Sequence, residues 1–343
     1  MHPDFQGTLK PPEDPDSFLR VAPELKDLSE FDFVPLLGKG KDSTNMIPED
    51  WTTIATAIYE RREQGYDGFV VAHGTDTMHF SASAVAFALG SELNFPVVFT
   101  GSQTTPDVQH GDARVNLLRA FKVAAADIAE VVISFGEYVF RGCRSQKKDE
   151  RRFDAFESPA FFRLAYITEE IIVSPWATQR SSRNGKIDFK PKFAPGVFQV
   201  SLIPGLEPEL LDGLVQNPKC QGIILQSFGA GNVPNQEPYS LEGFIKKACE
   251  EGKPVLIASQ FPANATLHTA YEPGKAAIAA GAIPTGNMTS ACAMVKFRWV
   301  LAQVNQMILY PKKQKKLERI KEMMNETYIG EMDIKGKLGL AKT

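Results

Sequence analysis

The sequence has few cysteines, no long apolar run and almost no net charge. Its four cysteines are Cys143, Cys220, Cys249 and Cys292. Their wide spacing contains no C-x-x-C pair, which argues against a disulfide framework and a cysteine zinc site and favours a reducing compartment. The N-terminal segment lacks a basic start followed by an apolar stretch, and nowhere do about 18 consecutive apolar residues occur. We therefore expect a cytoplasmic protein with no membrane partner.

Common catalytic and cofactor motifs are missing as well. G-x-S-x-G, H-E-x-x-H and G-x-G-x-x-G do not occur, and the Gly40-Lys41 pair lacks the glycine of a phosphate-binding loop, because that position is Pro35. The five histidines show no metal-ligand spacing, so we expect no metal and no cofactor. A net charge of −3 and a pI near 6.0 argue against a nucleic-acid partner. A small molecule is the expected ligand.

The residues that are present indicate an α/β protein. Hydrophobic residues make up 43% of the chain and charged residues 23%, which excludes a disordered or fibrous chain. Short β-branched runs, each followed by a turn and a helical pattern, occur at 68–73, 95–100, 130–135, 222–225 and 254–258. Strands that alternate with helices predict a parallel sheet, and runs that are apolar at nearly every position predict helices on both of its faces.

The 343 residues are enough for two domains, and an irregular polar stretch over 174–197 separates them. We expect a larger N-terminal parallel-sheet domain over 1–193 that carries the active-site motifs. A smaller C-terminal α/β domain would cover 197–330, followed by a tail over 331–343. Both domains are predicted to be doubly wound.

The sharpest local signal is H-G-T-D-T-M at 73–78, directly after an apolar strand and before a helical pattern. Ligands of α/β proteins gather at the carboxyl ends of strands, where a glycine admits a ligand and threonines supply hydroxyl groups. The alternative is that Thr75 or Asp76 only caps the helix.

A threonine hydroxyl becomes a good nucleophile only when a base takes its proton, and a lysine held by a carboxylate can do this. The charged run over 141–152 offers Lys147 and Lys148 just after the predicted strand 130–135. The alternative is an ordinary surface loop.

Several motifs together resemble the bacterial-type L-asparaginase family. They are D-S-T at 42–44, P-E-D-W at 48–51, H-G-T-D-T-M at 73–78, T-G-S at 100–102, Asp112 with Asn116 and Leu117, F-D-A-F-E-S at 153–158, L-I-P-G at 202–205 and G-A-G-N-V-P at 229–234. The resemblance covers nearly the whole chain and keeps the family's motif order. The family includes cytoplasmic and archaeal asparaginases and the asparaginase-like subunit of archaeal tRNA-dependent amidotransferase.

The resemblance implies hydrolysis of L-asparagine to L-aspartate and ammonia through attack by a threonine hydroxyl, without a metal or cofactor. Thr75 and Asp76 match the threonine and aspartate of the family's second catalytic group, and Lys147 matches its lysine by its spacing to Phe156. In that picture Lys147 helps to deprotonate Thr75 or its attacking partner. Asp76 orients the lysine and binds the α-amino group of the substrate.

Further positions match substrate-binding and interface residues of the family. Ser43 and Thr44 match the residues that hold the α-carboxylate, and the backbone of Gly74 can approach the ligand. The segment Thr100, Gly101, Ser102 would face the scissile amide. Asn232 and Tyr271 match positions that approach the site of a neighbouring subunit, which implies a homodimer or a dimer of dimers. The glycine-rich context of Asn232 also suits an ordinary turn.

The sequence departs from the family at its N-terminus. Family members begin with a T-G-G-T-I strand whose threonine belongs to the first catalytic group, and this motif is absent here. Residues 1–25 match the lid that follows the strand, where Thr8 falls near the place of the family's lid tyrosine; a plain flexible loop is the alternative.

Two explanations of this departure compete. Either Met1 is an internal methionine of a longer, ordinary enzyme, which is our expectation, or the chain is an inactive amino-acid-binding homologue. An amidotransferase subunit that takes ammonia from glutamine is a further alternative.

Overall fold

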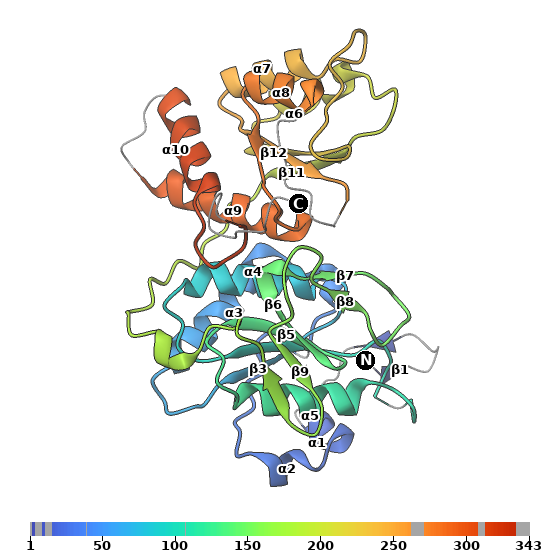
Figure 1. Ribbon diagram of the computed structural model, residues 1–343, viewed down its shortest axis with the longest axis vertical. Helices are drawn as coiled ribbons and strands as arrows, with labels where there is room; N and C mark the ends of the chain where they lie inside the picture. The colour runs from blue at the N-terminus through green and yellow to red at the C-terminus, as the bar shows by residue number, and fades with distance from the viewer. Residues whose placement is uncertain are drawn as a thin grey trace. The chain divides into compact units, whose positions relative to one another are not determined.

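Apolar, β-branched segments of the chain form parallel strands in two separate compact units, Met1–Pro191 and Lys192–Thr343 (Figure 1). The computed structural model describes residues 2–3, 9–10, 16–38, 40–106, 108–261, 271–307 and 313–333. In that part of the chain, no helix combines the length and the apolar character that crossing a bilayer requires. The two-domain α/β class that the sequence predicts is confirmed.

The first unit is built on a six-stranded sheet. In sheet order its strands are β10 (Ile171–Val173), β9 (Ala165–Ile167), β6 (Tyr138–Arg141), β5 (Val131–Phe135), β4 (Val97–Thr100) and β3 (Phe69–Ala72). β3, β4 and β5 are parallel, as predicted, whereas β6, β9 and β10 are antiparallel to their neighbours. The sheet is therefore mixed and not purely parallel. The direction reverses because Gly136, with φ of 58°, allows a tight turn straight from β5 into β6.

Helices cover both faces of this sheet. Its helices are α1 (Asp16–Val21), α2 (Leu25–Leu28), α3 (Pro48–Arg61), α4 (Met78–Leu89) and α5 (Ala113–Ala124). Figure 1 shows α4 on one face and α5 on the other. Nearly every residue of α4 is buried, which explains why its sequence is apolar on all sides. The doubly wound arrangement places the β3–α4 turn at the carboxyl end of the parallel strands.

Short elements complete the first unit. They are β1 (His2–Pro3), β2 (Leu9–Lys10), β7 (Gln146–Lys147), β8 (Phe156–Glu157) and the 3-10 turns η1 (Ser43–Asn45), η2 (Gly142–Arg144) and η3 (Arg180–Ser182). β7 and β8 form an antiparallel pair in which Lys147 lies opposite Phe156. The charged run of the sequence therefore contains a strand of its own.

The second unit has a smaller, fully parallel sheet. Its strands in sheet order are β11 (Val197–Ser201), β12 (Gly222–Ser227), β13 (Val255–Ser259) and β14 (Ile283–Pro284). Its helical elements are η4 (Pro208–Leu211), α6 (Asp212–Gln216), α7 (Glu242–Glu250), α8 (Glu272–Ala279), α9 (Ser290–Gln306) and α10 (Lys313–Asn325). The central strands are buried between helices, as their uninterrupted apolar runs predict.

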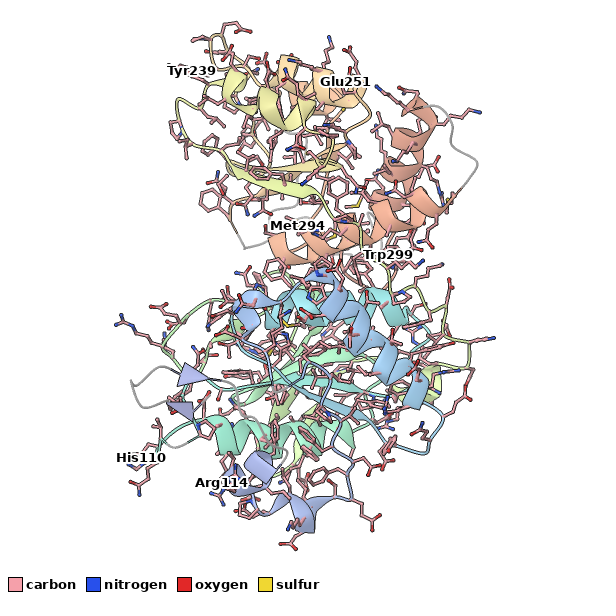
Figure 2. All side chains as sticks on the ribbon, turned by 180° about the vertical axis from the view of Figure 1, so that it is seen from behind. His110, Arg114, Tyr239, Glu251, Met294 and Trp299 are labelled. Carbon is pink, nitrogen blue, oxygen red and sulfur yellow. The ribbon has the colours of Figure 1, made fainter. Side chains whose placement is uncertain are left out.

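A buried ion pair joins α9 to the segment after α10. Lys296 and Glu331 are both fully buried, with Lys296 Nζ 2.7 Å from Glu331 Oε1, and the ammonium also donates to Met324 O at 3.0 Å. Burial alone would raise the pKa of Glu331, but the charge and the hydrogen bond of Lys296 outweigh it and lower that pKa. Trp299 of α9 (Figure 2) packs edge-on against Tyr328, with ring centroids 4.9 Å apart. The packed part of the second unit thus continues past residue 330, where the sequence pattern predicts the start of a tail.

Candidate functional site

The turn between β3 and α4 carries Thr75 and Asp76. Thr75 is buried and Asp76 is exposed. α4 begins at Met78 with Thr77 as its N-cap residue, and no side chain caps the helix there. Helix capping therefore does not account for the two residues. Their side chains turn instead toward the hairpin of β7 and β8.

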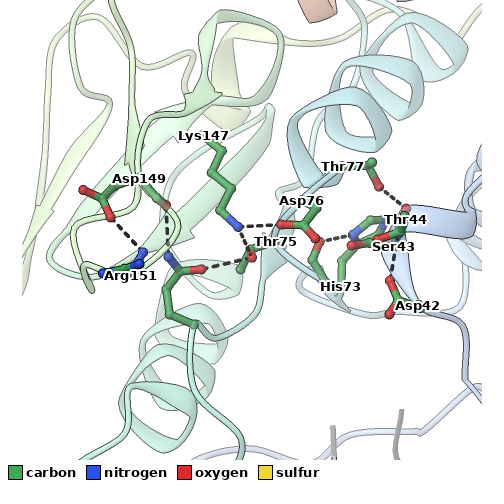
Figure 3. Close-up of polar contacts among 12 residues, drawn as sticks. Asp42, Ser43, Thr44, His73, Thr75, Asp76, Thr77, Lys147, Asp149 and Arg151 are labelled. Atoms are coloured by element: carbon green, nitrogen blue, oxygen red, sulfur yellow. Dashed lines mark hydrogen bonds and ion pairs between the residues drawn. The ribbon is translucent and has the colours of Figure 1, made fainter. Parts of the chain in front are cut away.

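Lys147 of β7 contacts both residues of this turn (Figure 3). Its Nζ lies 2.8 Å from Thr75 Oγ1 and 2.6 Å from Asp76 Oδ1. The lysine side chain is 14% exposed, whereas the Asp76 side chain is 62% exposed. A partly buried amine beside a hydroxyl can exchange a proton with it, and the open carboxylate can bind a ligand's ammonium group. The pairing of Lys147 with Phe156 anchors the backbone from which this side chain extends.

Ser43 lies directly against this turn. A Cβ on Gly74 would come within 2.6 Å of Ser43 Oγ, so only glycine fits at position 74. Thr77 Oγ1 donates to Ser43 O at 2.7 Å, and Asp42 Oδ1 accepts from Thr44 N at 2.8 Å (Figure 3). Ser43 is buried and Thr44 is exposed. The short η1 turn therefore brings one hydroxyl close to Gly74 and leaves the next one accessible.

The segment Thr100, Gly101, Ser102 follows the neighbouring strand β4. The Thr100 hydroxyl is directed into the core, where it donates to Ser134 O at 2.9 Å. A Cβ on Gly101 would lie 2.2 Å from His73 O, so glycine is required where the two strand ends meet. Ser102 Oγ donates to Thr104 O at 2.7 Å. The backbone of this segment, and not the Thr100 hydroxyl, is therefore the part that can face a ligand.

Gln103 makes a contact in the site that the sequence motifs do not predict. Thr75 Oγ1 donates to Gln103 Oε1 at 3.0 Å. The backbone of Gln103 is anchored, because its N–H donates to both carboxylate oxygens of the buried Asp112, at 3.1 and 3.0 Å. Asn116 Nδ2 also donates to Asp112, at 3.1 Å. The available signal was the position of a polar residue directly after T-G-S at the end of a parallel strand.

Two histidines flank the β3–α4 turn, His73 directly after β3 and His79 in the first turn of α4. His73 contacts Gly74 O through Nδ1 at 2.7 Å and Ser81 Oγ through Nε2 at 2.9 Å, and burial lowers its pKa. Burial, followed by the charge of Lys147, lowers the pKa of His79 to about 4. Both rings are therefore neutral at pH 7. These two rings therefore add no positive charge beside Lys147.

The remaining candidate residues lie elsewhere. Asn232 and Tyr271 belong to the second unit, where Asn232 closes a turn by exchanging backbone hydrogen bonds with Phe228. Tyr271 is 61% exposed and directly precedes α8. Thr8, the lid candidate, lies outside the described residues. Across the described ranges, no group of three or more His, Cys, Asp or Glu side chains is placed to hold a metal ion.

Family models match both parts of the chain. The model described as Asparaginase, N-terminal matches residues 1–179, and the model described as Glutaminase/Asparaginase C-terminal domain matches residues 196–308. An L-asparaginase of Thermococcus kodakarensis is 32% identical over 292 residues, which cover 85% of this chain and 83% of that protein. A glutamyl-tRNA(Gln) amidotransferase subunit of Methanosarcina mazei is 33% identical over 333 residues, which cover 93% of this chain and 72% of that protein.

Solved structures agree with these matches. The thermostable L-asparaginase from Thermococcus kodakarensis superposes with a TM-score of 0.80 at 29% identity, covering 97% of this chain and 95% of that one. L-asparaginase I from Vibrio cholerae gives a TM-score of 0.75 at 31% identity, with 86% and 84% covered. Because the family models account for both parts of the chain and the relatives extend over most of its length, the chain belongs to the asparaginase family.

Proposed function

We propose that the chain hydrolyses the side-chain amide of L-asparagine to L-aspartate and ammonia, with Thr75 as the nucleophile. The observation that carries the proposal is the three-way contact of Lys147 Nζ with Thr75 Oγ1 and Asp76 Oδ1. A hydroxyl, an amine that can take its proton and a carboxylate that orients the amine are the parts that nucleophilic catalysis needs.

The reaction would proceed in two balanced steps. In the first, Lys147 takes the proton of Thr75, whose oxygen bonds to the amide carbon; the carbon–nitrogen bond breaks, and ammonia leaves with the proton from the lysine. An aspartyl ester of Thr75 remains. In the second, Lys147 takes a proton from water, the hydroxide attacks the ester, and the proton returns to Thr75 as L-aspartate leaves.

The surrounding residues supply anchors for an α-amino acid. Asp76, which is largely open to solvent, would hold the α-ammonium group, and the η1 hydroxyls of Ser43 and Thr44 would hold the α-carboxylate. The backbone at Gly101 and Ser102 would face the amide oxygen, where N–H groups stabilise developing negative charge. Gly74 leaves room for the substrate backbone.

A second candidate is an amidotransferase subunit that releases ammonia from glutamine for a partner chain. The observation in its favour is the set of relatives named as subunits of a glutamyl-tRNA(Gln) amidotransferase, which match 93 to 95% of this chain at 30 to 33% identity. The chemistry at Thr75 would be the same, since glutamine has the same terminal amide. The two candidates differ in substrate and in dependence on a partner.

The test is ammonia release from L-asparagine and from L-glutamine by the chain, by Thr75→Ala and by Lys147→Met. Thr75→Ala removes the nucleophilic hydroxyl and Lys147→Met removes the proton acceptor, so each should lower kcat by at least about 100-fold. Lys148→Met is the matched control, because Lys148 is the adjacent lysine but pairs with Asp154 at the surface. It should retain kcat within about twofold, since a surface ion pair contributes little.

Each outcome separates the candidates. Turnover of asparagine by the chain alone supports the asparaginase. Turnover of glutamine that appears only with a partner and tRNA supports the amidotransferase subunit. Unchanged kcat in Thr75→Ala would remove Thr75 as the nucleophile, and calorimetric binding of L-aspartate without any turnover would indicate an inactive amino-acid-binding homologue.

We also propose that the active form is a homodimer or a dimer of dimers, with Asn232 and Tyr271 near the site of a neighbouring subunit. The exposed ring of Tyr271 is available for such a contact. Light scattering gives the assembly size. Tyr271→Ala should then raise KM for asparagine without lowering thermal stability; an unchanged KM would contradict the role of Tyr271.

A further inference from the structure

The side chain of Gln103 connects the reactive threonine to the turn after β7. Its Oε1 accepts from Thr75 Oγ1 at 3.0 Å, and its Nε2 donates to Asp149 O at 3.0 Å and to Arg152 O at 3.3 Å. Backbone carbonyls only accept hydrogen bonds, so Nε2 must face them. The orientation of the amide is therefore fixed, with its oxygen toward Thr75.

This orientation determines where the proton of Thr75 points. Because Gln103 Oε1 only accepts, the Thr75 hydroxyl must donate to it, and a lone pair of Thr75 Oγ1 then faces Lys147 Nζ at 2.8 Å. Without Gln103, the hydroxyl hydrogen would have no fixed direction. The amide thus selects one of the rotational states of the hydroxyl.

Further hydrogen bonds hold both the backbone of Gln103 and the turn that its side chain contacts. The Gln103 N–H is bound by the buried Asp112. The turn is closed by Asp149 Oδ1, which accepts from Arg151 N at 2.7 Å and from Arg152 N at 2.9 Å (Figure 3). Lys147 lies two residues before this turn, so the link also fixes the distance between the amine and Thr75.

We propose that Gln103 is a positioning residue of the amide hydrolysis, which holds the Thr75 hydroxyl in place and sets the spacing between Thr75 and Lys147. The inference rests on the proposed function. In the resting site Lys147 Nζ donates to Thr75 Oγ1, which in turn donates to Gln103 Oε1, so the hydroxyl is held from both sides. Gln103 does not touch the reacting amide; it acts through Thr75.

The test compares Gln103→Met and Gln103→Glu with the chain itself. Gln103→Met keeps the length of the side chain but removes all three hydrogen bonds. Because Thr75 is then no longer held at a fixed distance from the amine of Lys147, kcat should fall about tenfold while KM stays within about twofold. Gln146→Met is the matched control, since Gln146 precedes Lys147 in β7 but bonds to Glu157 and not to Thr75.

Gln103→Glu adds a readout that depends on pH. A protonated glutamic acid has the donor and acceptor pattern of glutamine, whereas its carboxylate would repel the carbonyls of Asp149 and Arg152. The kcat of Gln103→Glu, relative to that of the chain, should therefore rise as the pH falls from about 8 to about 5, and that of Gln103→Met should not. The titratable residues on the segments that contact Gln103 include Asp76, Asp112, Lys147, Asp149, Arg151 and Arg152; their charges are common to both variants.

A measurement that does not require turnover tests the Gln103 contacts independently of the proposed function. Loss of the Gln103 link should increase amide hydrogen exchange across 144–158 in Gln103→Met, and not in Gln146→Met. If the chain releases no ammonia, the proposed function fails, and unchanged exchange in Gln103→Met would still overturn the link. In an active chain, a Gln103→Met kcat within twofold of the original, or a change confined to KM, overturns the positioning role.

Discussion

His79 lies in α4, where burial and the charge of Lys147 both disfavour protonation of its ring. Its ring centroid is 4.7 Å from that of Phe80 and 6.4 Å from that of Phe156. The residue as a whole keeps some exposure, but its Nδ1 is buried without a hydrogen-bond partner. This apolar setting is the main reason that the pKa of His79 falls to about 4.

This lowered pKa predicts a loss of stability in acid. The unfolded chain takes up a proton at His79 below about pH 6.5, whereas the folded chain does so only near pH 4. The folded state is therefore disfavoured progressively as the pH falls between these values. The free energy of unfolding should drop by about 3 kcal/mol from this group. Urea unfolding at several pH values from 7 to 4 measures it.

His79→Leu should flatten this dependence, because leucine does not titrate. Part of the slope should remain, since burial also lowers the pKa of His73. His110→Leu is the control, because His110 is exposed at the surface (Figure 2). A His79→Leu protein that loses as much stability in acid as the original would contradict the assignment.

The candidate site could be predicted only in part from the residues. The strand-to-helix position of Thr75 and Asp76 followed from the apolar run before them, and the family spacing selected Lys147 over Lys148; the structure brings these three side chains into contact. Gln103 could not be identified from the sequence as a site residue. Its contacts join three loops, and these loops come together only because of the order of the strands in the sheet. The direction of the Thr100 hydroxyl was hidden for the same reason.

Gly222 allows β12 and α9 to pack closely. A Cβ at this position would lie 2.3 Å from Cζ of Phe297, whose ring is fully buried and has no room to move. Gly222→Ala should therefore lower the free energy of unfolding by about 1–3 kcal/mol through overpacking. Urea denaturation gives this value.

Gly243→Ala provides the comparison for this change. A Cβ at Gly243, in α7, would meet nothing within 4 Å, so alanine should stabilise the helix by about 0.5–1 kcal/mol. Opposite signs for the two substitutions are expected. Equal effects would mean that close packing against Phe297 does not determine the glycine at position 222.

The Lys296–Glu331 pair predicts a large effect from a small change. Glu331→Gln keeps the shape but leaves the ammonium of Lys296 buried without its counter-charge, so we expect a loss of about 3–5 kcal/mol. The double variant Lys296→Met, Glu331→Gln removes both charges but keeps an acceptor for the N–H groups of Tyr328 and Ile329, so it should lose less. Thermal unfolding of the three proteins tests this; a double variant less stable than Glu331→Gln would contradict it.

The strands show where pattern reading succeeds and where it fails. β4, β5, β12 and β13 are buried on both sides, so their uninterrupted apolar runs identify them. β6 was missed because it begins only two residues after β5 and is joined to it by the turn at Gly136. The mixed order of the first sheet follows from that hairpin, which the alternation of strands and helices does not reveal.

The four cysteines are dispersed over both units and held as thiols. Cys143, Cys220 and Cys292 are buried and Cys249 is partly exposed, and burial raises the pKa of Cys220 and of Cys249. A disulfide reagent that modifies free thiols should therefore react slowly with the native protein. After unfolding in guanidinium, it should react rapidly with all four cysteines. Reductant should leave the Tm unchanged, and a Tm that falls on reduction would contradict the assignment.

The contact between Lys147 and Thr75 joins residues that are 72 positions apart in the chain. Between them, the chain forms α4, β4, α5, β5 and the β5–β6 hairpin before Lys147 is reached. Closing so long a segment has a large entropic cost, which the sheet must offset before the two side chains can meet. During refolding, helical and strand signals should therefore return before the lysine–threonine contact forms.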